Sequence, residues 1–193
     1  MIPKLRLDAL TDGVFAVVMT LLVLELRLPE SFHPGSGADL LHRLGELAPQ
    51  VLIYALSFYV LSVRWVTLVQ MAPRGEEVAE GYTRWALLHL LLITFVPFTT
   101  SIMGRHTALA PAVWLYAANT ILFALVAMRM TQLANIEDDT RRMDYHIGLG
   151  TLIAASVLAI LVSLVAPKWA MLAYLFNLLD TPLRWWLRRR SSV

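Results

Sequence analysis

Long runs of apolar residues fill most of the chain, and the first of them, from Gly13 to Leu24, follows closely on charged residues. About 20 mainly apolar residues are enough for a helix to cross a bilayer. Arg6 and Asp12 lie at the start of this segment, and a charge inside a membrane helix costs roughly 2.5–3.5 kcal/mol on insertion scales. The pattern therefore favours a membrane helix that faces protein or water along part of its surface, as a transport protein requires.

The hydropathy pattern as a whole predicts an all-α integral membrane protein, in which residues 1–193 form a single domain of six transmembrane helices. The last predicted helix is the weakest, because an asparagine, an aspartate and a proline interrupt it. Two polar stretches, 28–46 and 133–144, are expected to be solvated loops. The predicted helices are about 7–27, 47–70, 83–103, 107–132, 145–166 and 168–187.

The composition is that of a membrane protein, with 58% hydrophobic residues, 16% charged residues and a mean hydropathy of +0.64. A soluble domain is about 45–50% apolar and about 25% charged. The chain has no cysteine, which excludes disulfides and thiolate metal sites. The first apolar run is longer than the core of a cleavable signal peptide, so we expect it to be retained as a helix.

The basic residues set the expected orientation of the chain. With the amino terminus in the cytoplasm, 12 of the 16 basic residues fall on the cytoplasmic side, as the positive-inside rule requires. Six crossings then place both termini in the cytoplasm. The basic terminal segment LRRRSSV is interpreted as a contact for anionic lipid head groups, and no nucleic acid is expected as a partner. The four basic residues on the outer side are Arg27, Arg43, Arg105 and Lys168.

Four polar side chains are expected at one depth near the cytoplasmic face, namely Arg6, Asp12, Arg64 and His89. Arg6 and Asp12 are about 240° apart around one helix, so each must reach a different neighbour. We therefore expect a polar network between helices. Two alternatives stay open, because the arginines can extend to the interface and His89 can be an ordinary buried histidine.

The first predicted helix also carries an apolar stripe, since Val17, Leu21 and Leu24 fall within about 60° of one another. Thr20 and Glu25 flank the stripe. Such a stripe is typical of packing or lipid contact. The alternative is that several subunits turn these stripes toward one axis and form a hydrophobic constriction, with a ring of Glu25 carboxylates near the outer mouth. Periodicity does not decide between them.

Motifs of other function classes are absent from the sequence. It has no TVGYG filter, no phosphate-binding loop, no HExxH helix and no GxSxG turn, so neither an enzyme nor a cofactor is indicated. His146, beside Asp144 and Tyr145, is interpreted as part of a polar surface and not as a metal site.

The segment RLDALTD at residues 6–12 resembles the R-x-x-x-F-S-D signature of the transmembrane protein 175-like channels, the endosomal/lysosomal potassium channel family. The continuation GVFAVVMTLLVLEL and the third-helix segment LLHLLLITFVPFTTSIMG are similar to that family as well. The length resembles that of a bacterial member with six helices. The resemblance thus extends over the whole chain, with its specific motifs in the first and third helices.

The resemblance implies a potassium channel in the bacterial plasma membrane, built as a homotetramer in which the first helix of each subunit lines the pore. Potassium ions and membrane lipids would be its partners, and proton permeability is implied by the animal members. The pore positions that it implies are Val17, Leu21 and Leu24, with Thr20 as a threonine layer at the constriction. The polar positions that it implies near the cytoplasmic side are Arg6, Asp12 and His89.

The chain departs from the family pattern at three positions. Leu10 and Thr11 replace a phenylalanine and a serine, and Val17 stands where isoleucine or leucine is usual. One methylene fewer in each subunit widens the constriction, so the sequence predicts weaker potassium selectivity than in relatives with isoleucine there.

Other functions compete with a channel. The first is a proton-coupled secondary transporter or exchanger that uses Asp12 and His89 as titrating groups. Such transporters often show inverted repeats or broken helices, and the sequence shows no convincing ones. A membrane scaffold explains the apolar stripe but not the buried aspartate. An integral membrane enzyme comes last.

Overall fold

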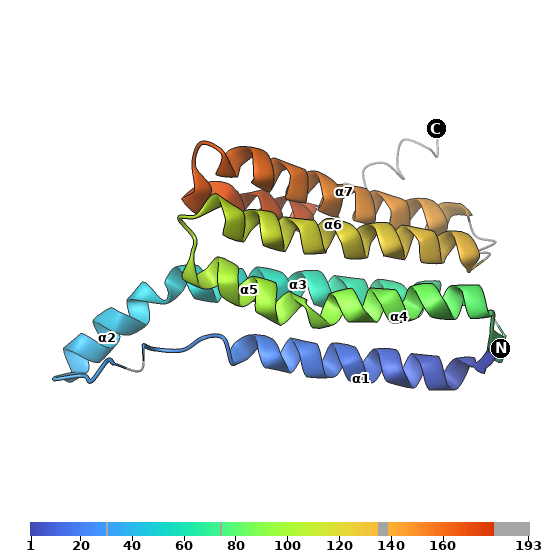
Figure 1. Cartoon of the computed structure of the whole chain (residues 1–193), viewed down its shortest axis with the longest axis horizontal. Coiled ribbons are helices and arrows are strands. Elements are labelled where there is room, and N and C mark those ends of the chain that lie inside the picture. The colour runs from blue at the N-terminus through green and yellow to red at the C-terminus, as the bar shows by residue number, and fades with distance from the viewer. Residues whose placement is uncertain (30, 74, 135–138, 180–193) are drawn as a thin grey trace.

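Helices form almost all of the protein in the computed structural model, which describes residues 1–29, 31–73, 75–134 and 139–179. Successive long helices run in opposite directions along one bundle (Figure 1). The helices are α1 (Lys4–Val23), α2 (Gly37–Glu46), α3 (Ala48–Met71), α4 (Glu80–Thr94), α5 (Val96–Arg105), α6 (Ala110–Leu133), α7 (Asp139–Ser163) and the 3₁₀ helix η1 (Pro167–Leu179). Two short strands, β1 (Ile2–Pro3) and β2 (Glu77–Val78), pair antiparallel.

Four helical segments are long and apolar enough to cross a membrane, namely Ala48–Met71, Glu80–Arg105, Ala110–Leu133 and Arg141–Ser163. They correspond to the second to fifth predicted spans, and the prediction of a helical membrane protein is confirmed. Helix α1 has 20 residues, about 30 Å of helix, but its charged residues set it apart from these four. The sixth predicted span begins in η1, and its residues 180–187 lie outside the described part of the chain. Six crossings therefore stay a prediction.

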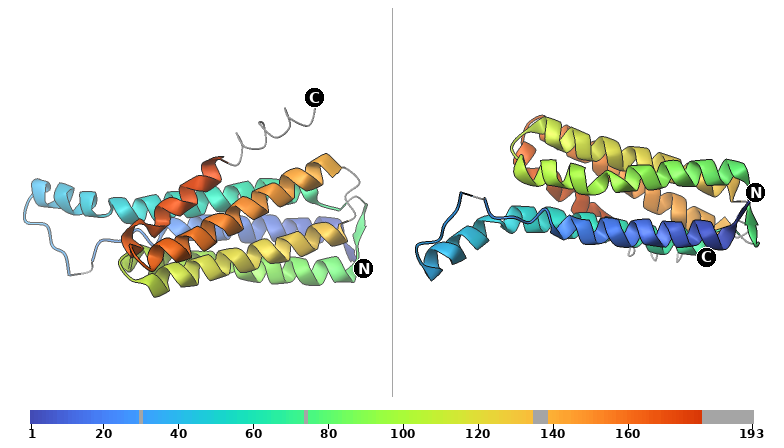
Figure 2. Two further views of the ribbon diagram at one scale, coloured as in Figure 1. Left: turned by 90° about the horizontal axis from the view of Figure 1, so that it is seen from above. Right: turned by 60° about the horizontal axis from the view of Figure 1, so that its bottom comes forward.

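The bundle has two distinct ends (Figure 1). At the amino-terminal end, β1 pairs with β2, so that Ile2 lies opposite Val78. The Lys4 amide also donates to the Glu76 carbonyl at 2.8 Å. The start of α1 is thereby tied to the segment between α3 and α4. At the opposite end, called here the α2 end, α2 projects beyond the other helices (Figures 1 and 2).

The expectation of a loop over 28–46 is wrong for the ten residues of α2. The Ser36 hydroxyl accepts a hydrogen bond from the Asp39 amide at 3.1 Å, which caps the first turn of the helix. The expected loop 133–144 is likewise wrong from Asp139 onward, because α7 begins there. Asp144 and Tyr145 are buried, so the interpretation of a polar surface around them is wrong.

The third predicted span is two helices that meet at Phe95. The Phe95 amide donates to the Leu92 carbonyl at 3.2 Å, which is an i to i−3 bond. Pro97 follows in the first turn of α5, where it has no amide hydrogen to continue the α4 ladder and its ring crowds the carbonyl four residues earlier. The proline therefore explains the break between α4 and α5.

Hydrogen bonds between side chains join the helices inside the bundle. Ser57 on α3 lies 3.0 Å from the Tyr116 hydroxyl on α6, and the Thr100 hydroxyl on α5 donates to Ser57 at 3.0 Å. The Asn119 side-chain amide donates to the Leu92 carbonyl at 3.2 Å. Polar bonds of this kind between membrane helices contribute about 0.6–2 kcal/mol each. These bonds join α3, α4, α5 and α6 into one framework. Helix α1 packs against one side of this framework (Figure 2).

Candidate functional site

Helix α1 has one buried and one exposed face. It packs against α3, α4 and α5 through a buried face. Val17, Leu21 and Leu24 are 56%, 42% and 51% exposed, so the predicted stripe points away from the rest of the chain. Leu10, which replaces the family's phenylalanine, is exposed as well. The buried side chains of α1 are Leu7, Phe15, Val18 and Leu22.

The stripe ends close to the last turn of α1. The helix stops at Val23, four residues before the predicted end, because the amides of residues 24, 25 and 26 bond to carbonyls three residues back. Glu25 therefore lies in the turn beyond the helix. Its carboxylate is 3.5 Å from the Arg105 guanidinium of α5, a partner that sequence reasoning missed. A ring of Glu25 carboxylates stays a prediction, and within the chain this charge has a basic neighbour.

Thr20 sits on the exposed side of α1, where its hydroxyl donates to the Val17 carbonyl at 2.7 Å. A threonine hydroxyl that donates to its own helix keeps its oxygen lone pairs free to accept a hydrogen bond or to coordinate a cation. Thr20 thus lies about 4.5 Å along the helix axis from Val17, next to the apolar stripe.

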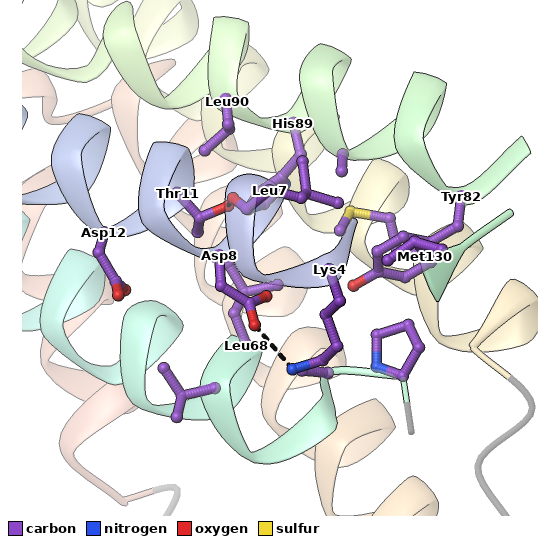
Figure 3. A pocket seen from close by; sticks show the side chains of 15 residues that line it. Lys4, Leu7, Asp8, Thr11, Asp12, Leu68, Tyr82, His89, Leu90 and Met130 are labelled. Atoms are coloured by element: carbon purple, nitrogen blue, oxygen red, sulfur yellow. Dashed lines mark hydrogen bonds and ion pairs between the residues drawn. The ribbon is translucent and has the colours of Figure 1, made fainter. Parts of the chain in front are cut away.

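A cavity of about 160 Å³ lies between α1, α3, α4 and β2 at the amino-terminal end. Asp8, Thr11 and Asp12 of α1 line one side of it, while Tyr82 and His89 come from α4 (Figure 3). Its volume and its polar wall are sufficient for several water molecules. The cavity therefore joins two of the predicted site residues, Asp12 and His89.

Two contacts at this end were not found from the sequence. The Trp65 indole nitrogen on α3 donates to an Asp12 carboxylate oxygen at 2.8 Å. The Lys4 ammonium lies 2.7 Å from the Asp8 carboxylate, one helical turn away. The i, i+4 spacing of lysine and aspartate was a signal for the second contact, whereas the first depends on the packing of α1 against α3.

His89 is buried, with 1% of its surface exposed. Its Nδ1 lies 3.2 Å from the Phe123 carbonyl, and the two rings meet edge to face at 6.0 Å. Among the described residues its Nε2 has no hydrogen-bond partner. A buried polar atom of this kind needs a water or another ligand to offset its desolvation, and the adjoining cavity can supply one.

The four residues of the predicted network lie in different surroundings. Arg6 is exposed, whereas Arg64 is buried, with its guanidinium 5.9 Å from the centre of the Tyr145 ring on α7. Arg64 therefore does not extend to solvent within the described chain. Asp12 and His89 share the cavity but bond to Trp65 and Phe123. Asp12 is exposed in the single chain, so the expectation of a buried aspartate is wrong there. A network that includes all four residues stays a prediction.

Several known proteins are similar to this chain. Residues 6–97, from α1 to the first turn of α5, match the family described as endosomal/lysosomal potassium channel TMEM175. A potassium channel of Chamaesiphon minutus is 32% identical over 136 residues, which are 69% of this chain and 66% of that protein. A potassium channel of Streptomyces collinus is 33% identical over 101 residues, 52% of this chain and 48% of that protein. These sequence matches thus span between about half and just under two thirds of the relatives' length.

The structural similarity extends further along the chain. The crystal structure of a lysosomal potassium-selective channel TMEM175 homolog from Chamaesiphon minutus superposes with a TM-score of 0.79 at 26% sequence identity. The superposition covers 94% of this chain and 97% of the Chamaesiphon chain.

Proposed function

Because the chain belongs to the TMEM175 potassium channel family, we propose that it is a potassium-preferring cation channel in which α1 of each of four copies lines a central pore. The observation that carries this proposal is the exposure of Val17, Leu21 and Leu24 on one side of α1. In the single chain nothing covers this stripe among the described residues. Four copies that turn it toward an axis form an apolar neck.

A second feature of α1 supports an assembly around an axis. Ala9, Gly13, Ala16 and Thr20 are all exposed, and they fall about 75° from the bulky stripe at 100° per residue. Small residues let membrane helices approach closely. The small stripe therefore suits contact with the α1 helix of a neighbouring subunit, while the bulky stripe beside it faces the pore.

The proposed selectivity comes from the cost of dehydration. An apolar neck offers a permeating ion no replacement for its water shell, and narrow hydrophobic constrictions gate by dewetting. Potassium ions lose hydration water more easily than sodium ions do, so potassium passes at lower cost. Val17, Leu21 and Leu24 form the neck in this proposal, with Thr20 beside them.

The amino-terminal end holds α1 in position for this task. The β1–β2 pair, the bond from the Lys4 amide to the Glu76 carbonyl and the Trp65–Asp12 hydrogen bond attach its first turns to the framework. Asp12 points toward α3 (Figure 3), and it lies about 140° around α1 from Val17. In this proposal Asp12 supports the pore helix and does not select ions.

Reconstitution in liposomes tests the proposal. Purified protein should release potassium down its gradient without transporting another ion in exchange. An added ionophore carries the current that balances the charge. Reversal potentials in mixed potassium and sodium should favour potassium. Protein-containing liposomes that leak no faster than empty ones, or that pass both ions equally, would contradict it.

The cavity that joins Asp12 and His89 favours a second candidate, a proton-coupled exchanger. A buried histidine nitrogen beside a carboxylate-lined cavity is an arrangement that can accept a proton. In that case every potassium ion that leaves the liposome would be exchanged for a proton that enters, and Asp12→Asn would abolish the coupling. Potassium flux without matching proton movement would exclude this candidate.

A further inference from the structure

We propose that the groove between α3 and η1 at the α2 end binds one anionic phospholipid. The groove has a volume of about 460 Å³, which lies within the range of about 300–1,000 Å³ typical of ligand sites. It is separate from the exposed stripe of α1 and from the cavity at the amino-terminal end. Its main lining residues are Ala48, Pro49, Leu52, Thr107, Lys168 and Leu172.

The walls of the groove are apolar and suit an acyl chain. Leu52 of α3 and Leu172 of η1 are both exposed on this surface, and Ile53 and Met171 close its floor as buried side chains. In a bilayer an apolar groove between helices is filled by lipid or by another protein surface, because an empty space forfeits its contacts. The shape therefore predicts that a chain of methylene groups occupies the groove.

The polar groups of the groove specify the head group. Lys168 and Thr107 line it, and no acidic side chain does among the described residues. Within that part of the chain, neither the Lys168 ammonium nor the Thr107 hydroxyl has a hydrogen-bond or ion-pair partner. Lys168 also lies in the first turn of η1, where a helix does not favour a positive charge. A phosphodiester would supply the missing negative charge and an acceptor for the hydroxyl.

The position of the groove along the bundle fits a lipid that enters from the membrane interface. Ala48 is the first residue of α3, and Lys168 is the second of η1, so the polar end of the groove lies where the helices reach the α2 end. Trp169 beside it is 65% exposed, and tryptophan is enriched at the level of lipid head groups. The head group and the acyl chain of one phospholipid thus match the two parts of this groove.

Native mass spectrometry of the purified full-length protein tests the proposal. The protein in detergent is titrated with phosphatidylglycerol or with phosphatidylcholine that has the same acyl chains. Lys168→Gln removes the cation at the groove, and Arg27→Gln removes a cation elsewhere at the same end. Ala48→Trp fills the groove, while Ala55→Trp on the exposed surface of α3 is its matched control.

The unchanged protein and Arg27→Gln should bind phosphatidylglycerol more tightly than phosphatidylcholine. Lys168→Gln should reduce this preference about five-fold, the effect of roughly 1 kcal/mol expected for one basic residue at an anionic lipid surface. Ala48→Trp should weaken the binding of both lipids, and Ala55→Trp should not. An equal preference in Lys168→Gln and Arg27→Gln would overturn the proposal. A change of oligomeric mass in Ala48→Trp, with lipid binding unchanged, would overturn it by assigning the groove to a second copy of the chain.

Discussion

The two faces of α1 carry nearly the same residues in different surroundings. Val17 and Leu21 are largely exposed, whereas their immediate neighbours Val18 and Leu22 are buried against α3, α4 and α5. Each pair has the same residue type and differs only by 100° around the helix. Within each pair the hydrophobicity is therefore constant, and only the burial of the side chain differs.

Hydropathy alone therefore cannot assign function within a membrane helix. Lipid tails are as apolar as leucine, so a lipid-facing side and a packed side need no difference in composition. The two faces differ in the number of close contacts that are lost when a side chain is shortened, which is large on the buried face and small on the exposed face. Substitutions at the paired positions measure that loss directly.

Shortening the buried leucine should have the largest effect. Leu22→Ala should lower the free energy of unfolding by about 2–5 kcal/mol, because a fully buried leucine leaves a cavity, whereas Leu21→Ala should lower it by less than about 1 kcal/mol. Thermal unfolding of both variants in the same detergent measures the difference. Equal losses would mean that Leu21 is packed in the assembly and does not line an open neck.

A polar side chain on the exposed face should change ion selectivity. Leu21→Ser should lower the potassium-to-sodium permeability ratio by on the order of ten-fold, about 1.4 kcal/mol, because a hydroxyl at the neck lowers the dehydration cost of both ions. Reversal potentials in mixed solutions measure the ratio. Leu125→Ser, at an exposed leucine of α6, is the control and should leave it unchanged. If the two variants behave alike, the pore is not lined by α1.

The contacts that hold the amino-terminal turns of α1 should contribute to stability without contributing to selectivity. Trp65→Phe removes the donor to Asp12 and should cost about 1 kcal/mol of unfolding free energy, as for one solvent-exposed hydrogen bond. Its permeability ratio should equal that of the native protein. Trp85→Phe is the control, since the Trp85 indole has no hydrogen bond among the described residues. A loss of selectivity as large as that of Leu21→Ser would place Asp12 in the conduction path.

Much of this arrangement could be predicted from the sequence because it depends on local periodicity. The spacing of Val17, Leu21 and Leu24 determines that they share one face wherever α1 is helical, and the structure shows that this face is exposed. The four candidate spans follow from long apolar runs that exceed the length needed to cross a bilayer.

The remaining features depend on contacts between distant segments or on competing local signals. The hydrogen bond between Asp12 and Trp65 joins residues 53 positions apart, and no spacing rule predicts such a pair. In the stretch before α2, Pro34 and Gly35 indicate a turn. The sequence therefore does not show that Ser36 caps a helix. The groove at Lys168 exists only because α3 and η1 meet there.

The smallest predicted effect concerns the one unusual residue of the neck. Val17→Ile adds one methylene per subunit at the proposed narrowest point and should raise the potassium-to-sodium permeability ratio about two- to five-fold, at most ~1 kcal/mol. Val18→Ile adds the same group one position away, on the buried face, where overpacking typically costs about 1–3 kcal/mol of stability. Reversal potentials and thermal unfolding of both variants complete the comparison. Val17→Ile should gain selectivity with unchanged stability, and Val18→Ile should lose stability without gaining selectivity. If the added methylene at Val17 brings no gain, the width of the neck at this residue does not limit selectivity.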